Sequence, residues 1–328
     1  MKFDLIEFDL IEMVRARCAS ARADVRIGIG DDGAVLAPPA DHELVATTDT
    51  LVEHVHFPIA TRPEDIGWKS LAVNLSDLAA MGATPAWALL ALTLPSPDRD
   101  FVERFADGFA ELAVQHGVAL VGGDTTSGPL TITVTAFGFV PPGQALLRSG
   151  ARAGDLVFVT GTLGDAAAGL RFPFEGLFQS PASSDACNVL RARLDRPTPR
   201  IAAGLILRER ASSCIDVSDG LLADLGHVAH ASSVGIDVAA LALPASPALL
   251  QAFGAPERLS LQATGGDDYE LAFTLAPKDE MIVLRDLAKA GCGATRIGRV
   301  VAGAGAVRVL DAQGGEIAMK RRGWEHFA

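Results

Sequence analysis

Residues 141–165 read PPGQALLRSGARAGDLVFVTGTLGD, and this stretch decides the expected architecture. It opens on a Pro-Pro-Gly turn, continues through the polar, glycine-bearing segment 149–154, and then restarts as an apolar run followed by a glycine turn. Polar turns of this kind typically separate domains. The restart predicts a second α/β unit, so we expect two domains, residues 1–148 and 149–328.

The segments on either side of this boundary alternate between helix and strand patterns. Helices are expected over residues 4–18, 63–81 and 99–116, and from residue 166 onward. Strands are expected over residues 25–29, 35–37, 44–48, 86–94, 118–121, 130–140 and 156–160. Gly82 and Gly117 are expected to end the two helices that precede them, and residues 171–199 to form a long connection around one helix. The predicted fold class is therefore α/β in both halves.

Composition excludes several classes of protein. The chain has 328 residues, of which 49% are hydrophobic, and a formal net charge of -12 that argues against a surface for nucleic-acid phosphates. The four cysteines are scattered without a C-x-x-C pair, so they indicate neither a zinc site nor a disulfide framework. The sequence also lacks an apolar run of membrane-spanning length, and its acidic N-terminal segment is unlike a secretory signal. We expect a cytoplasmic protein with no membrane or nucleic-acid partner.

Residues 28–33, GIGDDG, match the dinucleotide-binding pattern G-x-G-x-x-G. That site requires a helix next, because the helix N-terminus holds the pyrophosphate, but the chain continues to Pro38-Pro39. Two adjacent aspartates would also repel a bare pyrophosphate. We interpret the glycines as a sharp turn that exposes Asp31 and Asp32 at a strand end.

Carboxylates beside hydroxyl or glycine residues recur where elements are expected to begin or end. They lie in the segments 47–50, 122–125 and 216–220, and Asp77 lies inside an otherwise apolar helix. Taken singly, Ser218 or Asp219 could cap the helix that starts at residue 221, and Asp124 could form an Asx-turn, whereas an unpaired Asp77 is disfavoured in its helix. Repeated carboxylates without His or Cys partners suit a hard cation such as Mg²⁺. The sequence contains neither a P-loop nor a protein-kinase catalytic loop.

The ordered set of motifs resembles the thiamine-monophosphate kinase family, within the aminoimidazole ribonucleotide synthetase superfamily. The matching stretches are residues 28–32, 48–50, 72–82, 122–126, 216–221 and 268–271, and the resemblance covers nearly the whole chain. It implies ATP-dependent phosphorylation of thiamine monophosphate to thiamine diphosphate, with several Mg²⁺ ions. It also implies a homodimer in which the N-terminal sheets of two subunits meet in a barrel-like core.

The resemblance assigns roles to individual residues. Metal-binding roles fall on Asp32, Thr47, Thr48, Asp49, Asp77, Asp124, Asp216 and Asp219. ATP-binding roles fall on His116, Gly123, Arg148 and Ser218, and substrate-binding roles on His56, Asp267 and Trp324. Asp267 stands where the family often has Glu, and His116 where it has Tyr. No general base or nucleophile is implied, because a phosphate monoester is already largely ionised near neutral pH.

Two alternatives remain open at this point. A sister ATP-dependent synthetase of the same superfamily would keep the metal aspartates but change the substrate residues. A non-catalytic Mg²⁺-nucleotide sensor would bind ATP without turnover. Considered alone, His56, Arg148 and Trp324 are also explained as a packed histidine, a linker charge and a tail anchor.

Overall fold

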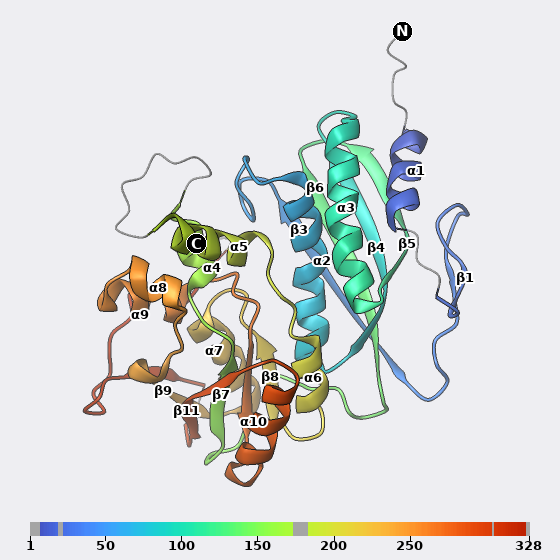
Figure 1. Ribbon diagram of the computed structural model, residues 1–328. Coiled ribbons are helices and arrows are strands. Elements are labelled where there is room, and N and C mark those ends of the chain that lie inside the picture. Colours follow the sequence, from blue (N-terminus) through green and yellow to red (C-terminus); the bar gives the residue numbers. More distant parts are fainter. Residues whose placement is uncertain (1–6, 19–21, 173–182, 304, 326–328) are drawn as a thin grey trace. The chain divides into compact units, whose positions relative to one another are not determined.

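The computed structural model describes residues 7–18, 22–172, 183–303 and 305–325 (Figure 1). Its contacts divide the chain into two compact units, residues 1–78 with 83–143 and residues 79–82 with 144–328. The division falls at 143/144 and not at the expected 148/149. The reason is that the carbonyl of Leu147 already accepts a hydrogen bond from the Cys214 N–H (2.9 Å), which joins this segment to the second unit.

The first unit is built on a four-stranded sheet with the strand order β3-β6-β4-β5. Its strands are β3 (Glu43–Val52), β4 (Thr84–Leu94), β5 (Ala119–Ser127) and β6 (Thr131–Val140). β6 is antiparallel to both of its neighbours, whereas β4 and β5 are parallel. The helices α2 (Pro63–Ala80) and α3 (Arg99–His116) cover one face of the sheet, and α1 (Glu7–Cys18) lies beside α3 (Figure 1).

Side chains of this sheet alternate between a covered and an open face. On β6, Ile132, Val134 and Ala136 are fully buried, while Thr133 and Thr135 between them are half-buried. The buried set faces the helices, since successive residues of a strand point to opposite faces. One face of the sheet therefore packs against the helices, and Thr133 and Thr135 lie on the other.

Strands β3 and β5 extend further than the sequence pattern predicts. β3 continues to Val52 and β5 to Ser127, so Asp49 and Asp124 lie within strands and not at strand ends. Every residue of β3 pairs with β6, and this continuous ladder overrides the polar composition of the segment. The position of Asp124 inside β5 excludes the Asx-turn considered for it. β1 (Val25–Ile27) and β2 (Val35–Leu36) form a separate pair, shorter than predicted.

The helix predictions for this unit are confirmed most closely at α3. Its N-cap is Asp98, whose side chain accepts the N–H of Phe101, and its C-cap is Gly117 in the left-handed conformation at φ 62°. The expected helix over residues 4–18 is described from Glu7 onward, and residues 4–6 lie outside the described residues.

The second unit is built on a six-stranded sheet with the order β12-β9-β11-β7-β10-β8. Its strands are β7 (Leu156–Thr160), β8 (Ser213–Asp216), β9 (Gly235–Ala239), β10 (Leu271–Leu275), β11 (Ala294–Val301) and β12 (Val307–Leu310). Its helices are α4 (Asp165–Gly169), α5 (Ser184–Asp195), α6 (Ile201–Leu207), α7 (Leu221–Ser232), α8 (Pro247–Ala252), α9 (Ala255–Thr264) and α10 (Glu280–Lys289). Two 3₁₀ turns, η1 (Ala240–Ala242) and η2 (Pro277–Asp279), complete it. Within the expected connection 171–199, α5 is the helix, and residues 173–182 lie outside the described residues.

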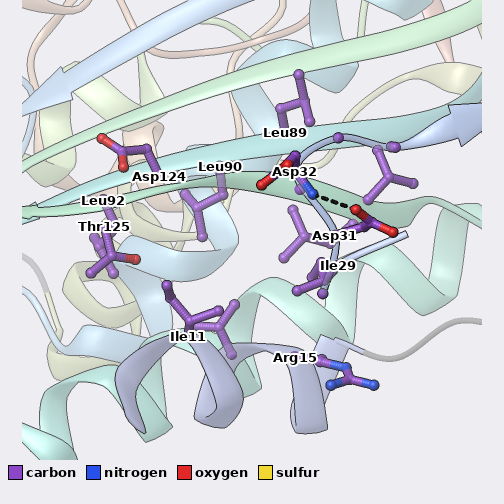
Figure 2. Close-up of a pocket in the computed structure, with 18 of the residues that line it drawn as sticks. Ile11, Arg15, Ile29, Asp31, Asp32, Leu89, Leu90, Leu92, Asp124 and Thr125 are labelled. Atoms are coloured by element: carbon purple, nitrogen blue, oxygen red, sulfur yellow. Dashed lines mark hydrogen bonds between the residues drawn. The ribbon is translucent and has the colours of Figure 1, made fainter. Parts of the chain in front are cut away.

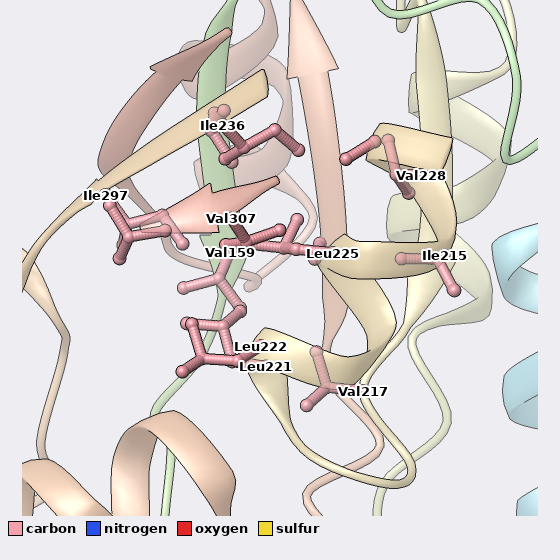
Figure 3. Packing of buried hydrophobic residues seen from close by; sticks show 14 of the residues in the cluster. Val159, Ile215, Val217, Leu221, Leu222, Leu225, Val228, Ile236, Ile297 and Val307 are labelled. Atoms are coloured by element: carbon pink, nitrogen blue, oxygen red, sulfur yellow. The ribbon is translucent and has the colours of Figure 1, made fainter. Parts of the chain in front are cut away.

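The core of this unit fixes α7 on the sheet. Leu221, Leu222 and Leu225 of α7 pack in one buried cluster with Val159 of β7 and Ile236 of β9 (Figure 3). Burying a side chain of this size contributes about 1.5–3 kcal/mol. The start of α7 is therefore held in place by apolar packing. Of the helices in the described ranges, none is both long and apolar enough to cross a membrane.

Candidate active site

A cavity of about 940 Å³ lies in the first unit between α1, the turn at residues 28–33 and the strands β4 and β5 (Figure 2). Its apolar walls include Ile11, Ile29, Leu89, Leu90, Leu92 and Phe137. Its polar lining includes Asp31, Asp32, Gly123, Asp124, Thr125, Glu12 and Arg15. The structure thus brings the predicted residues Asp32, Gly123 and Asp124 to one cavity.

Backbone geometry positions the two faces of this cavity. Gly123 has φ 153°, and a Cβ at this position would lie 1.8 Å from the carbonyl oxygen of Leu90, so only glycine lets β5 approach β4 this closely. Asp124 is the next residue and is exposed. In the opposite turn, the side chain of Asp31 accepts the N–H of Asp32 at 2.9 Å, which orients the Asp31 carboxylate.

Asp77 has a partner across the unit. The Oγ1 of Thr47 donates a hydrogen bond to Oδ2 of Asp77, so the polar residue in the apolar helix α2 is tied to β3. Asp49 lies two residues further on β3 and therefore on the same face of the strand as Thr47. Thr48 lies on the other face and donates to the carbonyl of Val134 at 3.1 Å.

The eight predicted metal-binding residues divide between the units. Asp32, Thr47, Thr48, Asp49, Asp77 and Asp124 lie in the first unit, and Asp216 and Asp219 in the second. Over the ranges that the structure describes, no three His, Cys, Asp or Glu side chains form a group that could hold a metal ion. The donor set itself is entirely carboxylate and hydroxyl oxygen, which suits Mg²⁺ and not zinc.

Two turns of the second unit lie against each other. Leu271 of β10 pairs with Asp216 of β8, so the turn before β10 runs beside the turn after β8. The N–H of Asp267 donates to the carbonyl of Ser218 at 2.8 Å, and the N–H of Trp324 donates to the carbonyl of Asp219 at 2.9 Å. Five predicted residues, from three separate stretches of sequence, are therefore neighbours in this unit.

The turn before α7 is held by a residue that the sequence reasoning missed. Oδ2 of Asp224 accepts the N–H groups of Ser218, Asp219 and Gly220 at 3.1, 3.2 and 3.1 Å. Gly220 is the N-cap residue and makes no side-chain cap, so the alternative in which Ser218 or Asp219 caps the helix is excluded. Burial, and then the negative charge of Asp219, raise the pKa of Asp224 to about 7. The position of Asp224, four residues after Gly220, is the sequence feature that could have indicated this role.

His56 is held by hydrogen bonds from the end of β3 and from α2. Its Nδ1 accepts the N–H of Val52 at 3.0 Å, and Nζ of Lys69 donates to its carbonyl at 3.2 Å. A neutral imidazole whose Nδ1 accepts a hydrogen bond carries its proton on Nε2. His56 is therefore a hydrogen-bond donor through Nε2.

Two predicted ATP-binding residues, His116 and Arg148, do not join the groups of residues described above. His116 is at the C-terminal end of α3 and does not line the cavity, and its burial lowers its pKa. The carbonyl of Arg148 accepts a hydrogen bond from Ser232 at the C-terminal end of α7 (3.4 Å). This 12-residue helix is about 18 Å long, and Ser218 lies before its other end.

Comparison with known proteins identifies the class to which this fold and site belong. Models of the AIR synthase related protein family match both units, the N-terminal domain over residues 30–140 and the C-terminal domain over residues 152–311. The thiamine-monophosphate kinase of Escherichia coli (strain K12) is 44% identical over 98% of both chains.

Two solved structures are similar over nearly the whole chain. The crystal structure of thiamine-monophosphate kinase from Stenotrophomonas maltophilia K279a is 50% identical with a TM-score of 0.85, covering 94% of this chain and 97% of that chain. AaThiL complexed with AMPPCP and TMP is 34% identical with a TM-score of 0.76, covering 98% and 97%. The chain belongs to the thiamine-monophosphate kinase family of AIR synthase related proteins, which confirms the resemblance found in its motifs.

The role of Asp224 can be tested by amide hydrogen exchange. We expect Asp224→Ala to speed exchange at the amides of Ser218, Asp219 and Gly220, because all three lose their common acceptor. Asp224→Asn is the control, since it keeps one acceptor oxygen and should retain part of the protection. Unchanged exchange of these amides in the Ala variant would contradict the assignment.

Proposed function

We propose that the protein transfers the γ-phosphoryl group of ATP to thiamine monophosphate, giving thiamine diphosphate and ADP. The observation that carries this proposal is the match, over nearly the whole chain, to thiamine-monophosphate kinases and to AaThiL in complex with AMPPCP and TMP. The predicted substrate residues Asp267 and Trp324, both in contact with the turn at residues 216–220, support it.

The cavity of the first unit is the proposed nucleotide site. Its volume of about 940 Å³ lies within the usual range for small-molecule sites, and its Ile and Leu walls suit a purine base. The exposed backbone at Gly123 can approach a phosphate closely because no side chain intervenes. Nucleotide-binding roles for Ser218, which lies in the second unit, and for His116 and Arg148 remain predictions made from the family.

Bound Mg²⁺ would explain why carboxylates line a cavity that is proposed to hold a polyphosphate. Asp31, Asp32 and Asp124 would repel phosphate oxygens unless a cation were bound with them. We propose that Asp32, Asp124 and the remaining predicted metal-binding residues hold Mg²⁺, which would neutralise charge on the transferring phosphoryl group when bound. Thr47 keeps the Asp77 carboxylate oriented for this role through its hydrogen bond.

The resemblance assigns acceptor-binding roles to three side chains of different chemistry, His56 in the first unit and Asp267 and Trp324 in the second. Nε2–H of His56 donates to a phosphate oxygen of thiamine monophosphate, the carboxylate of Asp267 attracts the cationic thiazolium, and the half-exposed Trp324 offers an aromatic face to it. A phosphate oxygen of the acceptor attacks the γ-phosphorus as the bond to the bridging oxygen of ADP breaks. No base is needed, and the protein acts by positioning and charge neutralisation.

The direct test is an assay of the purified chain with ATP, thiamine monophosphate and Mg²⁺. We expect thiamine diphosphate and ADP to form in equal amounts. ATP binding without product would favour the nucleotide sensor, and turnover only with a different phosphorylated acceptor would favour a sister synthetase.

The metal assignment predicts the effect of removing single charges. Asp77→Asn and Asp124→Asn should each lower kcat at least about 100-fold with little change in melting temperature, because a formal charge is lost while size is kept. Asp107→Asn on α3 is the control. The Asp107 side chain is 62% exposed and lies outside the proposed site, so the variant removes a charge of the same kind elsewhere. Near-normal turnover of both site variants at low Mg²⁺ would refute the assignment.

Trp324 can be separated from a mere tail anchor. A cation–π contact is worth about 0.5–2 kcal/mol, so Trp324→Ala should raise the KM for thiamine monophosphate roughly 2- to 30-fold and leave the KM for ATP unchanged. Trp324→Phe should recover most of the loss. A lowered melting temperature with both KM values intact would assign Trp324 to anchoring alone.

We also propose a cytoplasmic homodimer formed through the open face of the first unit's sheet. All four cysteines are free, as expected in a reducing compartment. On the open face, Thr50 and Thr133 share a hydrogen bond at 2.8 Å and Thr48 and Thr135 one at 3.0 Å, so these hydroxyl groups already pair with one another across β3 and β6. We expect Thr133→Arg to shift the chain toward monomer in sedimentation experiments, and Val114→Arg on the exposed side of α3 to leave the dimer intact. A monomeric wild type would refute the dimer.

A further inference from the structure

The turn at residues 265–270 contains unusual backbone. Asp267 and Tyr269 have φ angles of 69° and 49°, in the left-handed region that favours glycine. Two such residues separated by a single position are retained only where their surroundings determine the conformation, and they concentrate at ligand-binding sites.

This turn is held by the main chain of the turn at residues 216–220. The N–H of Asp267 donates to the carbonyl of Ser218 at 2.8 Å, and the N–H of Tyr269 donates to the carbonyl of Val217 at 2.9 Å. A Cβ at position 266 would lie 2.6 Å from the same Ser218 carbonyl, so Gly266 is needed for this approach. The two turns are therefore docked in a fixed register, and the left-handed residues are part of that docking.

Tyr269 adds a side-chain contact within the turn. It is the single tyrosine of the sequence, and its side chain is buried at 8% exposure. Its hydroxyl donates a hydrogen bond to Oδ1 of Asp267 at 3.1 Å. Because Tyr269 is buried, its hydroxyl reaches the carboxylate from a packed position, and the bond orients a side chain that is itself only half-buried.

We propose that Tyr269 is a positioning residue that orients the Asp267 carboxylate toward the cationic part of the acceptor. The inference rests on the proposed function. The hydroxyl acts through Asp267 and touches no reacting atom. The backbone bonds of the turn then place that carboxylate in register with Asp216 and Asp219, so acceptor and metal-binding side chains keep a constant spacing.

The test removes the hydroxyl alone. Tyr269→Phe should raise the KM for thiamine monophosphate about 3- to 10-fold, the range expected when one hydrogen bond to a binding group is lost. The KM for ATP and kcat should stay within about 2-fold of the wild type. Thr264→Val is the matched control, because it removes a hydroxyl at the end of α9, just before the turn, that donates to the helix carbonyl of Ser260 at 2.8 Å, and it should leave both KM values unchanged.

A double variant tests whether the effect passes through Asp267. Asp267→Asn keeps the size of the side chain and tolerates the left-handed backbone, but removes the charge. If Tyr269 acts by orienting that charge, adding Tyr269→Phe to Asp267→Asn should raise the KM for thiamine monophosphate by less than about 2-fold more. Multiplication of the two single effects would overturn the proposal. So would a lowered melting temperature with equal increases in both KM values, which indicates a structural role only.

Calorimetric titration of thiamine monophosphate separates this inference from the proposed function. If the wild type makes no thiamine diphosphate, the proposed function fails, and the dissociation constants of thiamine monophosphate for the wild type and Tyr269→Phe still decide the inference. Weaker binding by the Phe variant supports the positioning role. Equal dissociation constants, or no binding by the wild type, overturn it.

Discussion

The arrangement of the second unit depends on one buried carboxylate, Glu270. It is fully buried, and its oxygens accept hydrogen bonds from Arg193 (2.7 Å), from Nε and Nη2 of Arg200 (2.6 and 2.5 Å) and from Thr160 (2.7 Å). A buried charge without such partners destabilises a fold by several kcal/mol. The four bonds join β7, α5 and the segment before α6 to the start of β10, so the position at which β10 begins is fixed from three directions.

That fixed point explains how neighbouring acidic residues serve different purposes. Asp268 is buried and accepts the N–H groups of Gly164 (2.6 Å) and Ala166 (3.3 Å), and burial raises its pKa to about 8. Asp267 is half-buried and lies against the turn at residues 216–220. Asp268 therefore stabilises the start of α4, while Asp267 is the residue proposed to bind the acceptor. Sequence composition alone gives these two aspartates no distinguishing mark.

In the first unit, the predicted metal-binding carboxylates are positioned by strands, a helix and a turn. Its predicted metal-binding aspartates lie on β3, on α2, on β5 and in the turn at residues 28–33, and the structure shows what positions two of them. Thr47 orients Asp77, and the close approach permitted by Gly123 sets the position of Asp124. Such devices matter because like charges kept near each other repel until a cation binds. Hydrogen bonding by Thr47 and close strand approach at Gly123 therefore position two of the carboxylates for which metal binding is proposed.

The sequence by itself determined the two α/β halves, the bounds of α3 and β7 and, through the order of its motifs, the family. Periodicity and caps are local properties, so a single stretch of chain carries them. Only the tertiary structure decided that β3 and β5 continue through their aspartates, that Asp224 holds the turn before α7, and that Tyr269 bonds to Asp267. These outcomes depend on ladder partners, burial and backbone angles set by distant segments. The same short polar motif fits a turn or a strand until its neighbours in space select one.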